Sequence, residues 1–275
     1  METTVQRGQE LSHELCFEIA GVGVAVRWQG FWLRGLPPSY QDFISPAQAD
    51  IAFRILNGLP PLEQRQDPLF NAPGNWKLFR QNGSHRFEII ALDRGRVGQV
   101  AIMNANLTKG EVFVHPRWRR SGTVARGILR QELPPGRPMV PTWSVAQLIS
   151  PLGQLCLIQY LAKAKERGLM CHALGVIDQG RGLLFIGPSG SGKSTLARFW
   201  SEAGATVLGD ERIIIRNVQG QYRIYGTPWP GETRLVSRQC ATLSQLYFLS
   251  HAKAHTVKGE SRIRQFASFF PQVLF

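Results

Sequence analysis

The sequence predicts an α/β domain at residues 141–275, preceded by a smaller β-rich domain at residues 1–140. Residues 1–115 hold short segments rich in Val, Ile and Phe, separated by Pro and Gly clusters, a pattern typical of strands joined by turns. Residues 143–227 instead alternate strand-like and helix-like runs, the order expected in an α/β fold. The Arg- and Pro-rich text between them, ending in "LPPGRPMVPT", predicts the boundary.

The strands expected in the first domain are partly alternating and short, which favours a small antiparallel sheet or a sandwich. They are "LCFEIAGVGVAVRW", "DIAFRIL", "NWKLFRQ", "SHRFEIIALD", "GQVAIMNA" and "EVFVHP". No residue of this domain stands out as a candidate for chemistry. Its role stays open, with substrate capture or oligomerisation as the interpretations.

The second domain is expected to begin with a helix, because apolar residues recur at helical spacing in "WSVAQLISPLGQLCLIQYLAKAKERGL". Pro151 is expected to start or kink this helix. The predicted order then runs through a strand "MCHALGVI", a strand "LLFI", a glycine-rich loop, a helix "KSTLARFWSEAG", and strands "TVLGDE", "IIIRN" and "YRIYGT".

Bulk properties indicate an ordinary globular protein expected in the cytoplasm. No apolar run approaches the ~18 residues that a membrane-spanning helix needs, and the N-terminus lacks the layout of a signal peptide. Four cysteines lie far apart without a C-x-x-C pair, so the sequence indicates neither a zinc site nor a disulfide framework.

The chain is strongly basic, with a formal net charge of +13. Its densest basic run, residues 115–137, contains six Arg and one Glu. A solvated connector is the favoured interpretation, and a docking surface for an acidic partner or RNA is the alternative. A nucleic-acid partner is not favoured, because no zinc finger, RRM or helix-turn-helix pattern accompanies the charge.

The stretch "GPSGSGKS" fits the P-loop pattern G-x-x-x-x-G-K-[ST] and predicts that the chain binds ATP with Mg²⁺. Glycines let consecutive backbone N–H groups turn toward phosphate oxygens, and the helix that follows points its positive end at the anion. Lys193 would reach the β- and γ-phosphates, Ser194 would ligate Mg²⁺, and Thr195 would be a weaker contact. The expected nucleotide-binding set is Gly187, Pro188, Ser189, Gly190, Ser191, Gly192, Lys193, Ser194 and Thr195.

Two further positions could serve such a site. Asp210 and Glu211 end an apolar strand seventeen residues past Lys193, where a carboxylate can hold Mg²⁺ or take a proton from an attacking hydroxyl. His172 lies in the strand before the loop; on its own, a histidine in an apolar strand is more often a core residue.

The segment "CHALGVIDQGRGLLFIGPSGSGKSTLARFWSEAGATVLGDERIII" resembles the catalytic domain of HPr kinase/phosphorylase and its kinase-like relatives. The resemblance covers residues 165–250 and rests on the spacing of His172 from Gly187 and of Lys193 from Asp210. It implies an HPr-kinase/carboxykinase-like P-loop fold and ATP-dependent phosphorylation of a serine hydroxyl on a protein or peptide. Asp210 would be the general base with His172 beside it, Lys193 would complete the catalytic set, and Ser194 and Glu211 would serve Mg²⁺.

The later text "YGTPWPGETR" resembles a loop of the kinase-like relatives, which implies that Glu232 is a second metal or phosphate-side carboxylate and Arg234 a phosphate contact. An exposed Pro-rich turn is the alternative interpretation. The acidic pair is Asp-Glu where the family has Asp-Asp, and the family's later Gly-rich signature is not evident. HPr itself is therefore not the expected substrate.

The predicted function is transfer of the γ-phosphoryl group of Mg-ATP to a serine of a small protein or peptide. The alternative is a nucleotide-binding or sensing module, or an ATPase without phosphotransfer. An ABC-type ATPase is less favoured because no "LSGGQ"-like text follows. The partners expected are the serine-bearing substrate and, from the resemblance, further copies of the chain in a homo-oligomer, with no membrane. The apolar C-terminal end "SFFPQVLF" is expected either to dock on the domain or to mark the loss of C-terminal helices that the relatives have.

Overall fold

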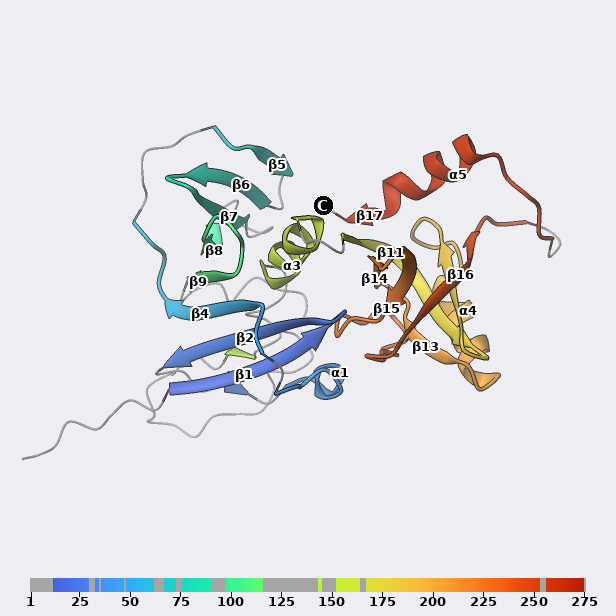
Figure 1. Cartoon of the computed structure of the whole chain (residues 1–275), viewed down its shortest axis with the longest axis horizontal. Coiled ribbons are helices and arrows are strands. Elements are labelled where there is room, and N and C mark those ends of the chain that lie inside the picture. Colours follow the sequence, from blue (N-terminus) through green and yellow to red (C-terminus); the bar gives the residue numbers. More distant parts are fainter. Residues whose placement is uncertain are drawn as a thin grey trace, which may run out of the picture. The chain divides into compact units, whose positions relative to one another are not determined.

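The computed structural model describes residues 12–29, 33–34, 36–46, 48–61, 67–72, 76–90, 97–115, 143–144, 152–163, 167–252 and 256–274. Contacts between Cα atoms divide the chain into two compact units (Figure 1). Unit 1 comprises Met1–Cys16, Val24–Gly35 and Gln48–Gly153, and unit 2 comprises Phe17–Gly23, Leu36–Ala47 and Gln154–Phe275. Two stretches of the N-terminal half therefore group with unit 2. Nearly all of the Arg-rich run 115–137 lies outside the described residues.

The N-terminal strands form an eight-stranded sheet in the order β1-β2-β4-β9-β8-β7-β6-β5. The pairs β2–β4 and β4–β9 are parallel, and the pairs from β9 through β8, β7 and β6 to β5 are antiparallel. Its strands are β1 Ser12–Ile19, β2 Val22–Gln29, β4 Ile51–Asn57, β5 Phe70–Ala72, β6 Trp76–Gln81, β7 Ser84–Ile90, β8 Val97–Met103 and β9 Lys109–Val114. Strand β3 Leu33–Arg34 pairs in parallel with β10 Trp143–Ser144. The short helix α1 Pro38–Gln41 belongs to unit 2.

Unit 2 contains a seven-stranded sheet in which one long strand is shared between two sets of partners. Strand β11 pairs with β14 and β17 through its first half and with β12 and β13 through its second half. The order β12-β16-β15-β14-β11 returns to β12, so the pairings close on themselves. The strands are β11 Gly168–Asp178, β12 Arg181–Ile186, β13 Thr206–Gly209, β14 Arg212–Val218, β15 Gln221–Tyr225, β16 Cys240–Phe248 and β17 Val273–Leu274.

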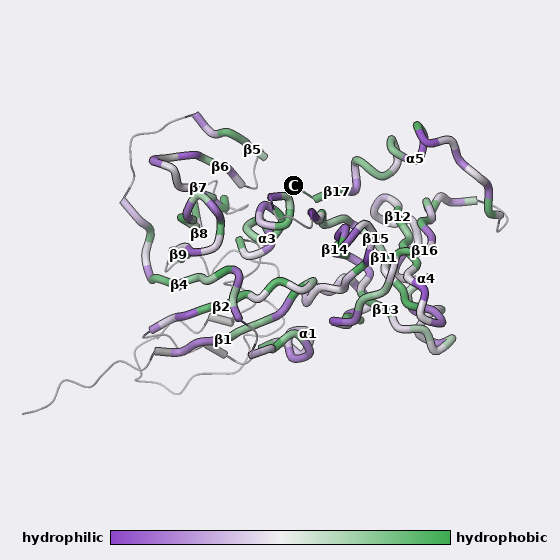
Figure 2. Tube along the Cα trace, viewed as in Figure 1, coloured by the Kyte–Doolittle hydropathy of each residue, from purple (hydrophilic) through white to green (hydrophobic). Residues whose placement is uncertain are grey.

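Helices α3 Leu152–Lys163, α4 Lys193–Glu202 and α5 Arg262–Phe269, with the 3₁₀ turn η3 Phe270–Gln272, complete the described part of unit 2. Among the described residues, no helix combines the length and the apolar character needed to cross a membrane. Along the tube in Figure 2, apolar stretches lie on the strands of both units and again on α5.

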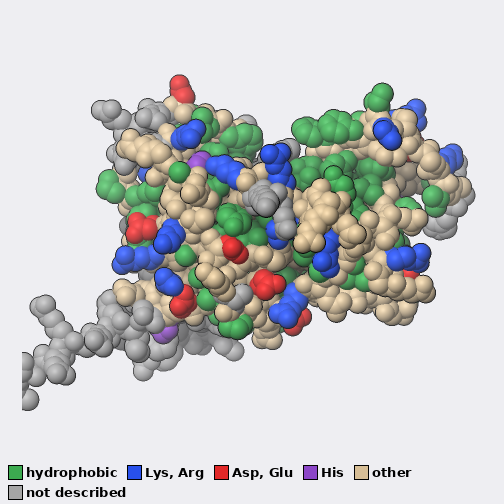
Figure 3. Space-filling model, viewed as in Figure 1, with side chains coloured by type: hydrophobic (Ala, Val, Ile, Leu, Met, Phe, Trp, Pro, Cys, Tyr) green, Lys and Arg blue, Asp and Glu red, His purple; other side chains and the backbone are tan. Residues whose placement is uncertain are grey.

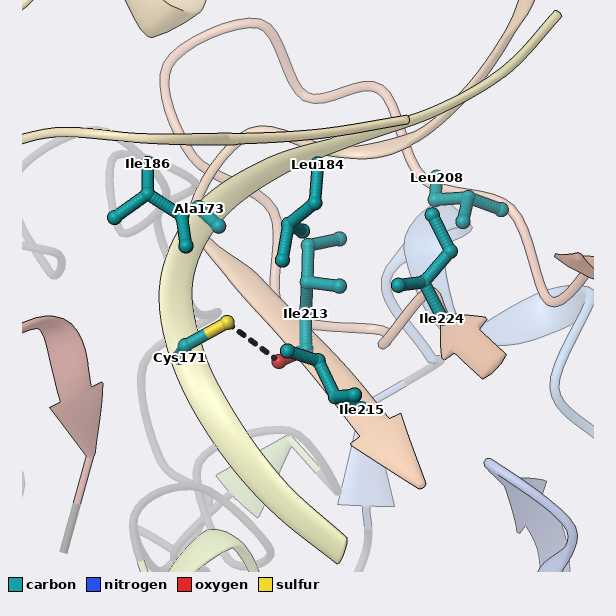
Figure 4. Close-up of a cluster of buried hydrophobic side chains, with 8 residues drawn as sticks. All are labelled: Cys171, Ala173, Leu184, Ile186, Leu208, Ile213, Ile215 and Ile224. Atoms are coloured by element: carbon teal, nitrogen blue, oxygen red, sulfur yellow. Dashed lines mark hydrogen bonds between the residues drawn. The ribbon is translucent and has the colours of Figure 1, made fainter. Parts of the chain in front are cut away.

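The strands of unit 2 enclose an apolar core drawn from strands far apart in sequence (Figure 4). Its buried members are Cys171, Ala173, Leu184, Ile186, Leu208, Ile213, Ile215 and Ile224. A second cluster packs α4 against β11 and β12 through Ala197, Leu174 and Phe185. Alternate residues of β11 and β12 therefore face different clusters, as the period of two along a strand requires.

The prediction of an α/β P-loop domain after a smaller β-rich domain is wrong. The structure is mostly β-sheet, built from two mixed sheets, and the N-terminal sheet is no smaller than the other. Each expected strand overlaps a strand of the structure, but β16 was not expected, and the expected segment "LCFEIAGVGVAVRW" contains two strands, β1 and β2. The pairing of the strands was not foreseen either. A tight turn at Gln179 and Gly180, both with positive φ, folds β11 and β12 into an antiparallel hairpin, and β13 after α4 pairs with β11 instead of β12.

Candidate functional site

The register of β11 gathers the candidate residues at one place. His172 is the last β11 residue paired with β14, opposite Arg212, and Ala173 is the first paired with β12, opposite Ile186. Arg212 directly follows Glu211, and Ile186 directly precedes the glycine-rich loop. The switch of partners along β11 therefore sets His172 between the acidic pair and the loop.

The glycine-rich loop, residues 187–192, links β12 to α4 with the backbone geometry that the sequence predicts. Gly190 and Gly192 have φ of 80° and 94°, values that other residues rarely adopt. A Cβ on Gly187 would meet Ser191 Oγ at 2.5 Å, so the loop turns back closely on itself. The first N–H groups of α4 lack intrahelical acceptors and point toward this loop.

Lys193, the first residue of α4, is 5% exposed and lies under the loop. Its Nζ donates hydrogen bonds to the carbonyl oxygens of Gly187, at 2.7 Å, and Pro188, at 2.9 Å. Burial lowers the pKa of Lys193, while the negative charges of Glu211 and, to a smaller extent, Asp210 oppose that shift. The lysine therefore lies within the electrostatic reach of both carboxylates.

The hydroxyl side chains of the loop and of the first turn of α4 differ in exposure. Ser189 and Thr195 are exposed, and Ser191 and Ser194 are half-buried. The Oγ atom of Ser191 is fully buried and has no hydrogen-bond partner within the described part of the chain. The first N–H groups of α4, the Ser191 hydroxyl and the Lys193 ammonium together fit a phosphate-sized anion.

Glu211 is the more accessible of the two predicted carboxylates, with 34% of its side chain exposed. Its Oε2 lies 3.1 Å from His172 Nε2, and its Oε1 lies 3.2 Å from an Arg212 guanidinium nitrogen. The hydrogen bond from His172 is the largest cause that lowers the pKa of Glu211, against burial, which raises it. Glu211 is thus an ionised, partly open carboxylate held by two basic groups.

Asp210 is instead almost completely buried, at 2% exposure. Its two carboxylate oxygens accept hydrogen bonds from the backbone N–H groups of Gly231, at 3.1 Å, and Thr233, at 3.2 Å. A Cβ on Gly231 would lie 2.6 Å from Asp210 Oδ1, so the loop packs directly on the carboxylate. In this structure Asp210 fixes the loop 226–233 next to the site.

Glu232 lies on that same loop, Arg234 follows it directly, and both are exposed. Glu232 stands between the two residues whose amides bind Asp210, so its backbone is held near the acidic pair. Arg234 has a φ of 58°, unusual for a residue with a side chain. The structure thus brings His172, Lys193, Asp210 and Glu211 together and leaves the side chains of Glu232 and Arg234 facing solvent.

Two contacts near the site were not foreseen. His251 Nε2 lies 3.0 Å from the carbonyl oxygen of Gly190, because β16 runs parallel to β12 with Phe248 opposite Ile186. Tyr40, at 2% exposure, is buried near Trp229 and Arg212, and burial raises its pKa. Neither contact has a local sequence signal, since both depend on pairings between distant segments.

Metal-ligating residues are sparse: the described residues contain no cluster of three or more His, Cys, Asp or Glu side chains that could hold an ion. Mg²⁺ is commonly bound through one or two carboxylates together with substrate phosphates. Ser194 and Glu211 remain the residues that the sequence predicts for such a site.

Comparison with known proteins gives one partial match. The sequence model of a family described as SynChlorMet cassette protein ScmC matches residues 139–256. The matched region contains the hairpin β11–β12, the glycine-rich loop, the acidic pair and the loop 226–233. No curated protein matches the chain.

Proposed function

We propose that this protein is a Mg-ATP-dependent phosphotransferase that transfers the γ-phosphoryl group to a serine hydroxyl of a small protein or peptide. The observation that carries the proposal is the convergence of Lys193, His172 and Glu211, from three separate segments, beside one glycine-rich loop. A nucleotide-binding loop alone requires no histidine–carboxylate pair at its side. A site that also moves a proton from an acceptor hydroxyl does require a base near the transferred group.

Each residue of the candidate site has a role in this proposal. Backbone N–H groups of the loop and the N-terminus of α4 would hold the phosphates, and Lys193 would neutralise their charge. Glu211, oriented by His172 and Arg212, is the carboxylate open to an acceptor or to a metal ion. Bound Mg-ATP supplies the transferable phosphoryl group. Asp210 would keep the loop 226–233, with Glu232, in place at the edge of the site.

A labelling experiment tests the proposal. The full-length chain is incubated with Mg²⁺ and γ-³²P-labelled ATP in the presence of a library of serine-containing peptides, and labelled peptide is separated from free phosphate. We expect labelled phosphopeptide with the wild-type chain and none with Lys193→Ala or Glu211→Gln. Nucleotide binding, measured with a fluorescent ATP analogue, should be lost in Lys193→Ala and retained in Glu211→Gln.

The other function that the site supports is a nucleotide-binding module or an ATPase. The burial of Asp210 favours this candidate, because the residue predicted as base is occupied by backbone amides. Release of free phosphate without labelled peptide would establish the ATPase. Binding of the ATP analogue without either product would establish the sensing module.

A further inference from the structure

Helix α5 is held against the sheet of unit 2 by its C-terminal end, through its last turn and the elements that follow it. Phe269 packs against the apolar core of the sheet, and β17, just beyond η3, pairs with β11 at Met170 and Cys171. At the other end the Ser261 hydroxyl accepts a hydrogen bond from the Arg264 backbone N–H at 3.4 Å and caps the helix. The helix thus leads through η3 into β17, which pairs with the strand that carries His172.

The remainder of α5 and the first residue of η3 present large apolar side chains to solvent. Ile263 is 83% exposed, Phe266 is 66% exposed and Phe270 is 52% exposed. Their spacing of three and four residues places them on one side of the helix, and the rings of Phe266 and Phe270 stack with centroids 5.6 Å apart. Figure 3 shows apolar side chains gathered over α5 at the upper right, with basic side chains beside them. We name this set of three residues the α5 face.

Such a face calls for a partner, for two reasons. All residues of α5 except Phe269 are exposed, and a helix of eight residues is well below the ~12–15 at which isolated helices become marginally stable in water. Contiguous exposed apolar surface on a soluble domain also commonly marks a site of interaction. A covering partner would bury the face and add the contacts that the helix lacks.

Charge indicates which kind of partner fits. Lys258, Arg262 and Arg264 accompany the face, and Glu260 is the single acidic residue of residues 256–274, paired with Arg264 at 3.6 Å. The whole chain carries a net charge of +13. A second copy would bring like charges together, which is unfavourable. A helix of about 12 Å, from 1.5 Å per residue, is also short for lying in a bilayer surface. An acidic polypeptide matches both the charge and the length.

We propose that the α5 face docks an acidic, apolar segment of the polypeptide that carries the acceptor serine. Naming the docked polypeptide as the substrate rests on the proposed phosphotransfer, whereas the docking itself does not. Apolar side chains of the segment cover Ile263, Phe266 and Phe270, and its carboxylates lie near Arg262 and Lys258. Because α5 leads through η3 into β17, which pairs with β11 beside His172, a docked substrate is tethered to the unit that holds the glycine-rich loop.

The test uses the full-length chain without nucleotide, so its outcome is independent of any phosphotransfer. The probe is a fluorescein-labelled amphipathic peptide of Leu and Glu, with Leu at i, i+3, i+4 and i+7, and binding is followed by fluorescence anisotropy. Matched peptides carry Lys in place of Glu, or Gln in place of Leu. We expect the Leu/Glu peptide to bind and both controls to bind at least ~10-fold more weakly.

Variants of the chain assign the binding to the face. Phe266→Gln should weaken binding of the Leu/Glu peptide by ~10-fold, and Arg262→Glu should weaken it in a salt-dependent way without altering the apolar residues. Phe199→Gln is the matched control, because Phe199 is 61% exposed on α4 and lies outside the face. Circular dichroism of each variant checks the fold, and Arg262→Glu keeps the test decisive if Phe266→Gln unfolds.

Several results would overturn the docking proposal. They are no binding of the Leu/Glu peptide, equal binding of the Lys peptide, or an equal loss of binding in Phe199→Gln. Self-association in sedimentation velocity that depends on Phe266 would assign the face to a second copy. Binding to phosphatidylglycerol vesicles in place of the peptide would assign it to a membrane surface. Peptide binding with no labelled phosphopeptide in the separate assay would retain the docking site and reject the proposed reaction.

Discussion

Substitution of Asp210 by Asn separates a structural role of this carboxylate from a catalytic one. The change keeps one acceptor oxygen but replaces the other with an amide group that donates. One of the two backbone N–H groups, of Gly231 or Thr233, would then face a donor inside a site where the side chain is 2% exposed. The charge that strengthens both hydrogen bonds is also lost.

The magnitude follows from those two hydrogen bonds. A hydrogen bond to a charged group contributes about 1.5–3 kcal/mol, and a buried N–H left unsatisfied costs about 1–3 kcal/mol. Weakening one bond and replacing the other should lower the free energy of unfolding by about 2–4 kcal/mol. For a unit of this size that corresponds to a decrease of roughly 5–15 °C in the unfolding midpoint.

Differential scanning calorimetry of Asp210→Asn against the wild type measures the effect, and hydrogen exchange at residues 229–234 localises it. Glu211→Gln is the matched control: its side chain is one-third exposed, so loss of its ion pairs should cost below about 1 kcal/mol. An Asp210→Asn midpoint equal to the wild type, with unchanged exchange in the loop, would refute the structural role. Loss of phosphotransfer in that stable variant would restore Asp210 as a residue of the reaction.

Three further predictions concern single residues. The pKa of Glu211 lies below its ordinary value of 4.5 chiefly because of His172. The pair therefore stabilises the folded chain at pH values above 4.5, and this stabilisation is lost as the pH falls through the lowered pKa of the folded state. In His172→Ala the free energy of unfolding, measured by urea titration, should therefore fall less than in the wild type between about pH 6 and pH 3. The same pH dependence in variant and wild type would contradict the stabilising role of the pair. Burial raises the pKa of Cys171 to about 12, so at pH 8 a thiol reagent should label Cys240 and leave Cys171 unlabelled by mass spectrometry. Leu184→Ala should cost about 2–5 kcal/mol in urea denaturation because Leu184 is fully buried; a cost under about 1 kcal/mol would show that the core refills the space.

The segment around the loop could be predicted from sequence because its signals are local. An apolar run predicted a strand and the structure has β12 Arg181–Ile186; the helix expected from Lys193 is α4 Lys193–Glu202. The positive φ of Gly190 and Gly192 follows from glycine itself. Helix α3 begins at Leu152, close to where Pro151 predicted a start.

The pairing of strands could not be predicted, because it depends on residues far apart in the chain. The five short strands and the loop expected in the second domain are compatible with many sheets, and the strand–loop–helix order is typical of an α/β domain. For the same reason, the sequence did not indicate that Asp210 is buried while Glu211 is partly exposed. Asp210 and Glu211 are adjacent in a bend between β13 and β14, and only the position of the loop 226–233 shows which of the two side chains is covered.

The division of β11 between two sets of partners has a consequence for how unit 2 opens. Its amides are bonded to β14 and β17 at one end and to β12 and β13 at the other. A fluctuation that frees His172 must break pairings in both halves of the sheet, so it approaches the full cooperative opening of the unit. The histidine, the acidic pair and the loop should therefore be lost together on denaturation, and the slowest amides of unit 2 to exchange with solvent should be those of β11.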